Sequence, residues 1–226
     1  MKFGTDGVRG VANTELTAEF ALNLGRAAAQ VLSRLGPDSS SEPVDVVVIG
    51  GDTRESTPML SAALGAGFAT EGVDVINLGT ATTPMVAFEA QRLGVMGAVV
   101  SASHNPYGDN GIKLFAPGGT KLPDEVESRI EAALASLGAP IGAAGRLGTH
   151  DDTAPYSAHV LGLLGGRDLS GIKVVLDAAH GAGCEIAPQV LRAAGADVVV
   201  IAADPDGRNI NDGCGSTHLQ SLQSAV

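Results

Sequence analysis

Short apolar runs alternate along the first part of this chain with longer segments that have a single apolar face. The apolar runs have the length of a strand and lie at residues 44–50, 73–79 and 95–100. The spacing of apolar residues predicts helices at 18–35, 59–70 and 84–93, with Thr17 and Thr83 as N-caps of the first and third. Strands that are apolar throughout are typical of parallel sheets. The pattern therefore predicts an α/β fold with a mixed, mainly parallel sheet sandwiched by helices.

The remainder of the chain repeats this alternation after an interruption. We expect a loop at 36–41, a short strand at 112–115, a charged helix at 124–136 and a loose linker at 138–148. A second series follows, with a helix at 154–164, a strand at 172–177, a helix at 185–194 and a strand at 197–202. These series predict two domains, 1–150 and 151–226, the second of which ends without a closing element.

A polar segment directly after the apolar run 95–100 is the first candidate for a functional site. It contains Ser103, His104 and Asn105, with Lys113 further on, and its Pro and Gly residues bend the backbone. Ligands of open α/β sheets bind at the carboxyl ends of strands. Because phosphoryl transfer requires mainly positioning and charge neutralisation, Ser103 is a candidate carrier of a phosphoryl group. The alternative is a turn in which serines bond to the backbone and His104 is idle.

A glycine-rich segment at 3–10 is a candidate anion site. Its backbone amides, with Thr5 and Arg9, can approach a phosphate. The alternative is a flexible amino terminus. The chain has no Gly-x-Ser-x-Gly elbow and no Gly-x-x-x-x-Gly-Lys-Ser/Thr loop, so the sequence does not support a serine hydrolase or a P-loop enzyme.

Two features of the second series admit other interpretations. The polar segment 204–218, with Arg208 and Asn209, is expected to face substrate or the other domain, or else to form a solvated turn with an N-cap at Ser216 or Thr217. The second feature imitates a dinucleotide-binding unit: a strand is followed by Gly181 and Gly183, then by a helix, and later by Asp204. The third glycine of such a unit is missing.

Composition and charge narrow the function classes. The 14 Lys and Arg against 25 Asp and Glu give a formal net charge of −11, which makes nucleic-acid binding a poor hypothesis. The beginning of the chain lacks the apolar region of a signal peptide, and no apolar run has the length of a membrane span. Cys184 and Cys214 have neither disulfide-framework nor zinc spacing. We therefore expect a cytoplasmic protein without a membrane partner.

Several motifs together resemble one enzyme family. Ser101-Ala102-Ser103-His104-Asn105-Pro106 resembles the phosphoserine signature of the α-D-phosphohexomutases. The segments 3–10, 110–113, 206–211 and 214–218 resemble that family too, and in particular its bacterial members that act on glucosamine phosphates. The resemblance extends over essentially the whole chain.

The resemblance implies a reaction and a set of roles. A mutase of this kind interconverts glucosamine 6-phosphate and glucosamine 1-phosphate through a phosphoserine at Ser103 and a sugar bisphosphate, which also serves as activator. Mg²⁺, held in part by the phosphoserine, neutralises the transferring group. By this resemblance Lys113 is a candidate general base, and Arg9 and His104 belong to the catalytic group. Asn105, Thr5, Arg208 and Asn209 are expected to bind substrate or phosphate.

The resemblance also leaves alternatives and departures. A phosphomannomutase or phosphoglucomutase of the same family, or a non-catalytic phosphosugar-binding fragment, stays open, and a homodimer is a further expectation. Gly51 stands where relatives usually have a basic residue, and Thr57 where they usually have glycine, from which we expect a local effect. Family members have four domains, so we expect the second to be truncated before the metal-binding loop, the last two to be absent, and the 226 residues alone to be inactive.

Overall fold

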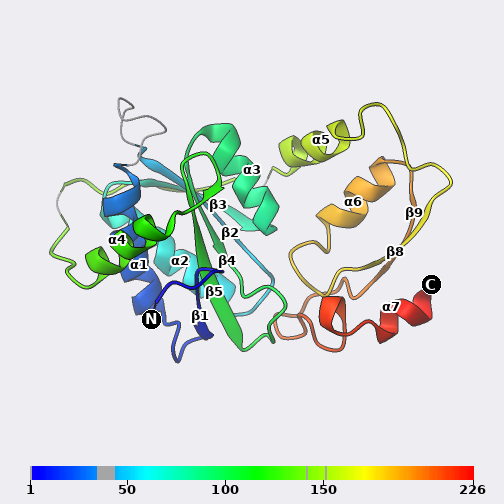
Figure 1. The fold of residues 1–226 in the computed structure, drawn as a ribbon, viewed down its shortest axis with the longest axis horizontal. Helices are drawn as coiled ribbons and strands as arrows, with labels where there is room; N and C mark the ends of the chain where they lie inside the picture. The colour runs from blue at the N-terminus through cyan, green and yellow to red at the C-terminus, as the bar shows by residue number, and fades with distance from the viewer. Residues whose placement is uncertain (1, 35–43, 141, 151) are drawn as a thin grey trace. The chain divides into compact units, whose positions relative to one another are not determined.

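The computed structural model describes residues 2–34, 44–140, 142–150 and 152–226, which form two compact units (Figure 1). Unit 1 comprises Met1–Gly51, Ser56–Ala102 and Asp109–Asp151, and unit 2 comprises Asp52–Glu55, Ser103–Gly108 and Asp152–Val226. Two short loops that follow strands of unit 1 therefore belong to unit 2. The loop expected at 36–41 and the expected helix end at Leu35 lie outside the described residues.

Unit 1 contains a seven-stranded mixed sheet with the order β1-β5-β4-β2-β3-β7, and β6 pairs with β5. The strands are β1 (Val8–Val11), β2 (Val46–Gly51), β3 (Asp74–Thr80), β4 (Met96–Val100), β5 (Asp109–Ala116), β6 (Thr120–Lys121) and β7 (Leu147–Thr149). The strands β4, β2, β3 and β7 are parallel to one another, and β5 pairs antiparallel with β4 and β1. The predicted mixed α/β architecture is confirmed.

Helices cover both faces of this sheet (Figure 1). They are α1 (Ala18–Leu32), α2 (Thr57–Thr70), α3 (Thr83–Leu93) and α4 (Asp124–Leu134). Successive residues of β2 point to opposite faces of the sheet. Val47 and Ile49 belong to the core cluster with α1 and α2, whereas a Cβ at Gly50 would meet Val86 of α3. The sheet is thus buried on both sides, which explains its continuous apolar strands.

The cap of α3 differs from the prediction by one residue. Thr82, and not Thr83, is the N-cap, and its Oγ1 accepts a hydrogen bond from the Met85 amide at 3.4 Å. Pro84 is therefore the second residue of the helix, a position whose amide needs no partner inside the helix. Thr17 caps α1 as predicted and accepts from the Phe20 amide at 3.1 Å.

Two edge strands lie where the sequence predicts loops. β1 falls in the glycine-rich amino-terminal segment and pairs antiparallel with β5, with Val8 opposite Ile112. β7 begins inside the predicted linker and pairs parallel with β3, where the Val75 amide donates to the Arg146 carbonyl at 2.7 Å. Both are short and hold few apolar residues, so backbone pairing defines them and an apolar pattern does not.

Unit 2 contains a strand–helix–strand element, as predicted. Its elements are α5 (Ala154–Gly162), β8 (Lys173–Asp177), α6 (Ile186–Ala193), β9 (Asp197–Ile201), a 3₁₀ turn (Gly215–Thr217) and α7 (Gln220–Ala225), and β8 pairs parallel with β9. The expectation of an N-cap at Ser216 or Thr217 is wrong, because both lie inside the 3₁₀ turn and Leu219 precedes α7. None of the described helices is long and apolar enough to cross a membrane.

Candidate active site

Ser103 lies in the loop Ser103–Gly108, which follows β4 and belongs to unit 2. Its φ is 56°, in the left-handed region that residues other than glycine rarely adopt. Ser103 and His104 are exposed, and Asn105 is half-buried. Backbone strain of this kind persists only where the surroundings fix it, and it clusters at functional sites. The loop thus presents an exposed serine on a constrained backbone.

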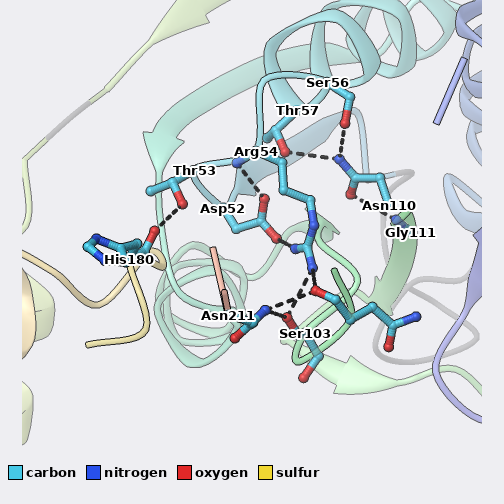
Figure 2. Close-up of polar contacts among 11 residues, drawn as sticks. Asp52, Thr53, Arg54, Ser56, Thr57, Ser103, Asn110, Gly111, His180 and Asn211 are labelled. Atoms are coloured by element: carbon cyan, nitrogen blue, oxygen red, sulfur yellow. Dashed lines mark hydrogen bonds and ion pairs between the residues drawn. The ribbon is translucent and has the colours of Figure 1, made fainter. Parts of the chain in front are cut away.

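Two carbonyl groups of this loop receive donors from two distant parts of the chain (Figure 2). Arg54 Nη2 donates to the carbonyl oxygens of Ser103, at 3.2 Å, and of Asn105, at 2.6 Å. Asn211 Nδ2 donates to the same two oxygens, at 2.9 Å and 3.0 Å. Each carbonyl can accept two hydrogen bonds, so this pair of donors satisfies both.

Arg54 is buried in an ion pair. Its side chain is fully buried and its Nη1 contacts the Asp52 carboxylate, which also accepts the Arg54 amide at 3.1 Å. A buried guanidinium requires such a partner, because an unpaired charge is costly away from water. Sequence reasoning missed Asp52, Arg54 and Asn211; the available signal was the charged turn that directly follows the buried strand β2.

The turn that carries Arg54 is fixed to the rest of unit 2 on either side. Thr53 Oγ1 donates to the His180 carbonyl at 2.5 Å (Figure 2), and the Glu55 amide donates to the Gly207 carbonyl at 2.9 Å. Arg208 Nε donates to the Glu55 carboxylate at 2.7 Å. That hydrogen bond and the charge of Glu55 raise the pKa of Arg208 above its usual value. Arg208, predicted to bind phosphate, is thus engaged by a carboxylate in this structure.

Asn209 stabilises the turn that contains it. Its amide donates to the Asp206 carboxylate at 2.8 Å, its Nδ2 donates to the Asp204 carbonyl at 2.9 Å, and its Oδ1 accepts the Asp206 amide at 3.0 Å. The amides of Arg208 and Asn209 lower the pKa of Asp206, because they stabilise its charged form. A substrate-binding role for Arg208 and Asn209 remains a prediction.

The predicted cations of unit 1 share one carboxylate. Asp6 lies 3.5 Å from Arg9 Nη2 and 3.8 Å from Lys113 Nζ, measured from its carboxylate oxygens. β1 and β5 place these side chains, with Arg9 opposite Gly111 in the ladder. Thr5 lies in the exposed turn before β1. Because these residues belong to unit 1 and Ser103 belongs to unit 2, their joint action on a phosphate remains a prediction.

The buried side-chain amide of Asn110 connects the beginning of β5 with the beginning of α2 in unit 1. Asn110 is fully buried, and its Nδ2 donates to Ser56 Oγ at 2.9 Å and to Thr57 Oγ1 at 3.1 Å (Figure 2). Nearby, a Cβ added at Gly51 would overlap the Thr57 methyl group. Gly51 and Thr57, the two positions at which we expected departures from the family pattern, are therefore complementary: the missing side chain at Gly51 leaves the room that Thr57 occupies.

The described residues do not form a metal site of their own. Over residues 2–34, 44–140, 142–150 and 152–226, no three His, Cys, Asp or Glu side chains gather in a group that could hold a metal ion. Mg²⁺ prefers several oxygen ligands, and a phosphorylated Ser103 would supply only one side chain. These residues alone therefore do not fit a complete Mg²⁺ site.

Both cysteines should react slowly in the folded chain. Cys184 and Cys214 are buried, and burial raises the pKa of each thiol. The thiolate is the reactive form. We expect iodoacetamide at pH 8 to label both at least about tenfold more slowly in the native chain than in urea. Peptide mass spectrometry measures the two rates, and equal rates would contradict the buried, protonated thiols.

Comparison with known proteins identifies the fold and the family. Residues 1–139 match the family Phosphoglucomutase/phosphomannomutase, alpha/beta/alpha domain I. A crystal structure of a phosphoglucomutase/phosphomannomutase family protein from Burkholderia thailandensis superimposes with a TM-score of 0.82 at 26% identity, over 99% of this chain and 49% of that one. This agreement does not support the dinucleotide-binding alternative for unit 2.

Curated relatives are more similar in sequence. Phosphoglucosamine mutase of Rhodococcus opacus (strain B4) is 53% identical over 230 residues, which cover 99% of this chain and 51% of that protein. Phosphoglucosamine mutase of Frankia casuarinae is 54% identical over 235 residues, with 99% and 50% covered. The chain thus spans about half the length of these relatives. On the family match over residues 1–139, the chain belongs to the phosphoglucomutase/phosphomannomutase family, the α-D-phosphohexomutases.

Proposed function

We propose that this chain takes part in the phosphoglucosamine mutase reaction and supplies the serine that carries the phosphoryl group. The observation that supports this most directly is the exposed residue Ser103 on a left-handed backbone, where the carbonyls of Ser103 and Asn105 accept hydrogen bonds from Arg54 and Asn211. Relatives at 53% and 54% identity are phosphoglucosamine mutases, which favours glucosamine phosphate as the substrate. The substrate class is a sugar phosphate.

The proposed reaction has two phosphoryl transfers. In the first, the bond between Ser103 Oγ and phosphorus breaks, a bond from a sugar hydroxyl oxygen to phosphorus forms, and the hydroxyl proton passes to Lys113 as general base. In the second, the other phosphate of the resulting glucosamine 1,6-bisphosphate returns to Ser103, and the proton returns to the sugar oxygen that is released. Arg9 stabilises the charge of the transferring group, Asn105 and Thr5 orient phosphate oxygens, and His104 supports the same loop.

Mg²⁺ is generally required in this family, and when bound it neutralises charge on the transferring phosphoryl group. A phosphoserine at Ser103 is its one proposed contact in this chain. Glucosamine or glucose 1,6-bisphosphate is the proposed activator. A homodimer and a cytoplasmic location are further proposals.

An assay with three substrates tests this function. We expect the complete protein, supplied with Mg²⁺ and glucose 1,6-bisphosphate, to turn over glucosamine 6-phosphate with a higher kcat/KM than glucose 6-phosphate or mannose 6-phosphate. Intact mass should show one added phosphate, mapped to Ser103. A preference for glucose or mannose phosphate would favour a phosphoglucomutase or phosphomannomutase. Binding of the phosphosugar without turnover and without phosphorylation would favour a non-catalytic binding protein.

A further inference from the structure

We propose that Arg54 and Asn211 are positioning residues for Ser103: they hold the carbonyls of Ser103 and Asn105 and thereby fix the backbone that presents the nucleophile. This inference rests on the proposed function, because it concerns the same serine. It adds two residues and a mechanism that the phosphoserine motif does not contain. Neither residue contacts the Ser103 hydroxyl in the hydrogen bonds described above.

The geometry holds the loop at two points. The carbonyls of Ser103 and Asn105 are two residues apart, and each receives one bond from Arg54 and one from Asn211, at 2.6–3.2 Å. Fixing both carbonyls restricts the torsion angles of the residues between them. A strained left-handed residue persists only when its surroundings over-determine it, and these four bonds provide that determination for Ser103.

The two donors are not equivalent. Arg54 Nη2 carries two hydrogens, one for each of the two carbonyls, while Nη1 contacts Asp52. The planar guanidinium makes this arrangement possible, and an ammonium group cannot reproduce its fixed geometry. Asn211 has a neutral amide, is half-buried, and has a φ of 61°. Arg54 should therefore contribute more to positioning than Asn211, and lysine should not substitute for Arg54.

Asn211 also connects the loop to a later segment of unit 2. Its amide donates to the Ala179 carbonyl at 3.0 Å. The Ala179 amide donates to the Asp177 carboxylate at 2.9 Å, and that carboxylate also accepts the Gly215 amide at 2.7 Å. The residues that hold Ser103 thus come from 52–55 and from 177–215 of the chain. The position of the nucleophile depends on both segments.

Three variants test the proposal in the complete protein. Arg54→Lys removes the planar guanidinium, and Asn211→Ala removes the neutral donor from a half-buried position. Arg26→Lys is the matched control: Arg26 also binds a carboxylate, Glu71, at 2.7 Å and a backbone carbonyl, that of Gly138, at 2.6 Å, but both partners belong to unit 1. Each variant is compared with the unmodified protein for melting temperature, for hydrogen exchange of the peptide 101–110, and for kinetics.

Kinetics provide the readout that a purely structural role would not change. We expect the rate of Ser103 phosphorylation from glucose 1,6-bisphosphate, followed by intact mass, to fall about 100-fold in Arg54→Lys and about 10-fold in Asn211→Ala. The kcat should fall by the same factors while KM changes less than about threefold. In Arg26→Lys the phosphorylation rate and kcat should both stay within about twofold of those of the unmodified protein.

The outcomes separate this inference from the proposed function. An Asn211→Ala variant with unchanged melting temperature, exchange and phosphorylation rate would overturn the positioning role, even when Arg54→Lys fails to fold. A protein that gains no phosphate and has no turnover would overturn the proposed function. In that case faster hydrogen exchange of the peptide 101–110 in Asn211→Ala, and not in Arg26→Lys, would still support the positioning role. Exchange in Asn211→Ala equal to that in the unmodified protein would refute it.

Discussion

Replacement of Ser103 by alanine should abolish phosphoryl incorporation and lower the mutase kcat of the complete protein by roughly four orders of magnitude or more. The reason is chemical: a covalent intermediate cannot form without the hydroxyl, whereas the surrounding backbone is unchanged. Alanine and serine have similar steric limits in the left-handed region, and the carbonyls held by Arg54 and Asn211 remain in place. A coupled assay for glucosamine 1-phosphate and intact mass spectrometry measure the two effects.

A second serine provides the control for this variant. Ser128 is exposed, lies on α4 and donates to the Asp124 carbonyl at 2.9 Å. Ser128→Ala should keep the phosphate on Ser103 and a kcat within about twofold of the unmodified protein. Substantial turnover in Ser103→Ala, or a phosphate mapped to another residue in that variant, would show that Ser103 is not the phosphoryl carrier.

The central sheet could be predicted because burial on both faces leaves a strong sequence pattern. β2 and β4 are buried along nearly their whole length, so apolar residues occupy successive positions. β1 and β7 could not be predicted in this way. β1 contains Arg9 and Gly10, and every residue of β7 is exposed. Their pairing with β5 and β3 depends on the arrangement of the whole sheet.

Ser103 could be predicted as the candidate nucleophile, but the residues that hold its loop could not be predicted. Ser103 stands in a dense polar motif after a buried strand, which is visible along the chain. Arg54 and Asn211 act on Ser103 across 49 and 108 positions of sequence. Their acceptors are backbone carbonyls, which every residue has. A contact of this kind leaves no pattern in a single sequence, and only the folded unit shows why a turn after β2 carries a buried ion pair.

Replacement of Gly67 by alanine should destabilise unit 1, whereas the same replacement at Gly65 of the same helix should not. Gly67 lies in α2 where α2 packs against α1, and an added Cβ would overlap the Leu22 carbonyl oxygen and lie 3.0 Å from the Arg26 amide nitrogen. Both obstacles are helix backbone, so relief requires the two helices to separate. We expect the free energy of unfolding to fall by about 3 kcal/mol, which corresponds to a melting temperature lower by roughly 6–12 °C.

Gly65→Ala on the same helix is the matched control. Its Cβ would meet its nearest neighbour, the Val75 side chain, at 3.4 Å, an ordinary contact. Both variants gain the same helix propensity over glycine, about 1 kcal/mol, so their difference isolates the close approach of α1 and α2. Thermal and urea unfolding followed by circular dichroism should show Gly65→Ala as stable as the unmodified chain or slightly more stable. Equal stability of the two variants would mean that α1 and α2 can separate at little cost and that Gly67 does not set their distance.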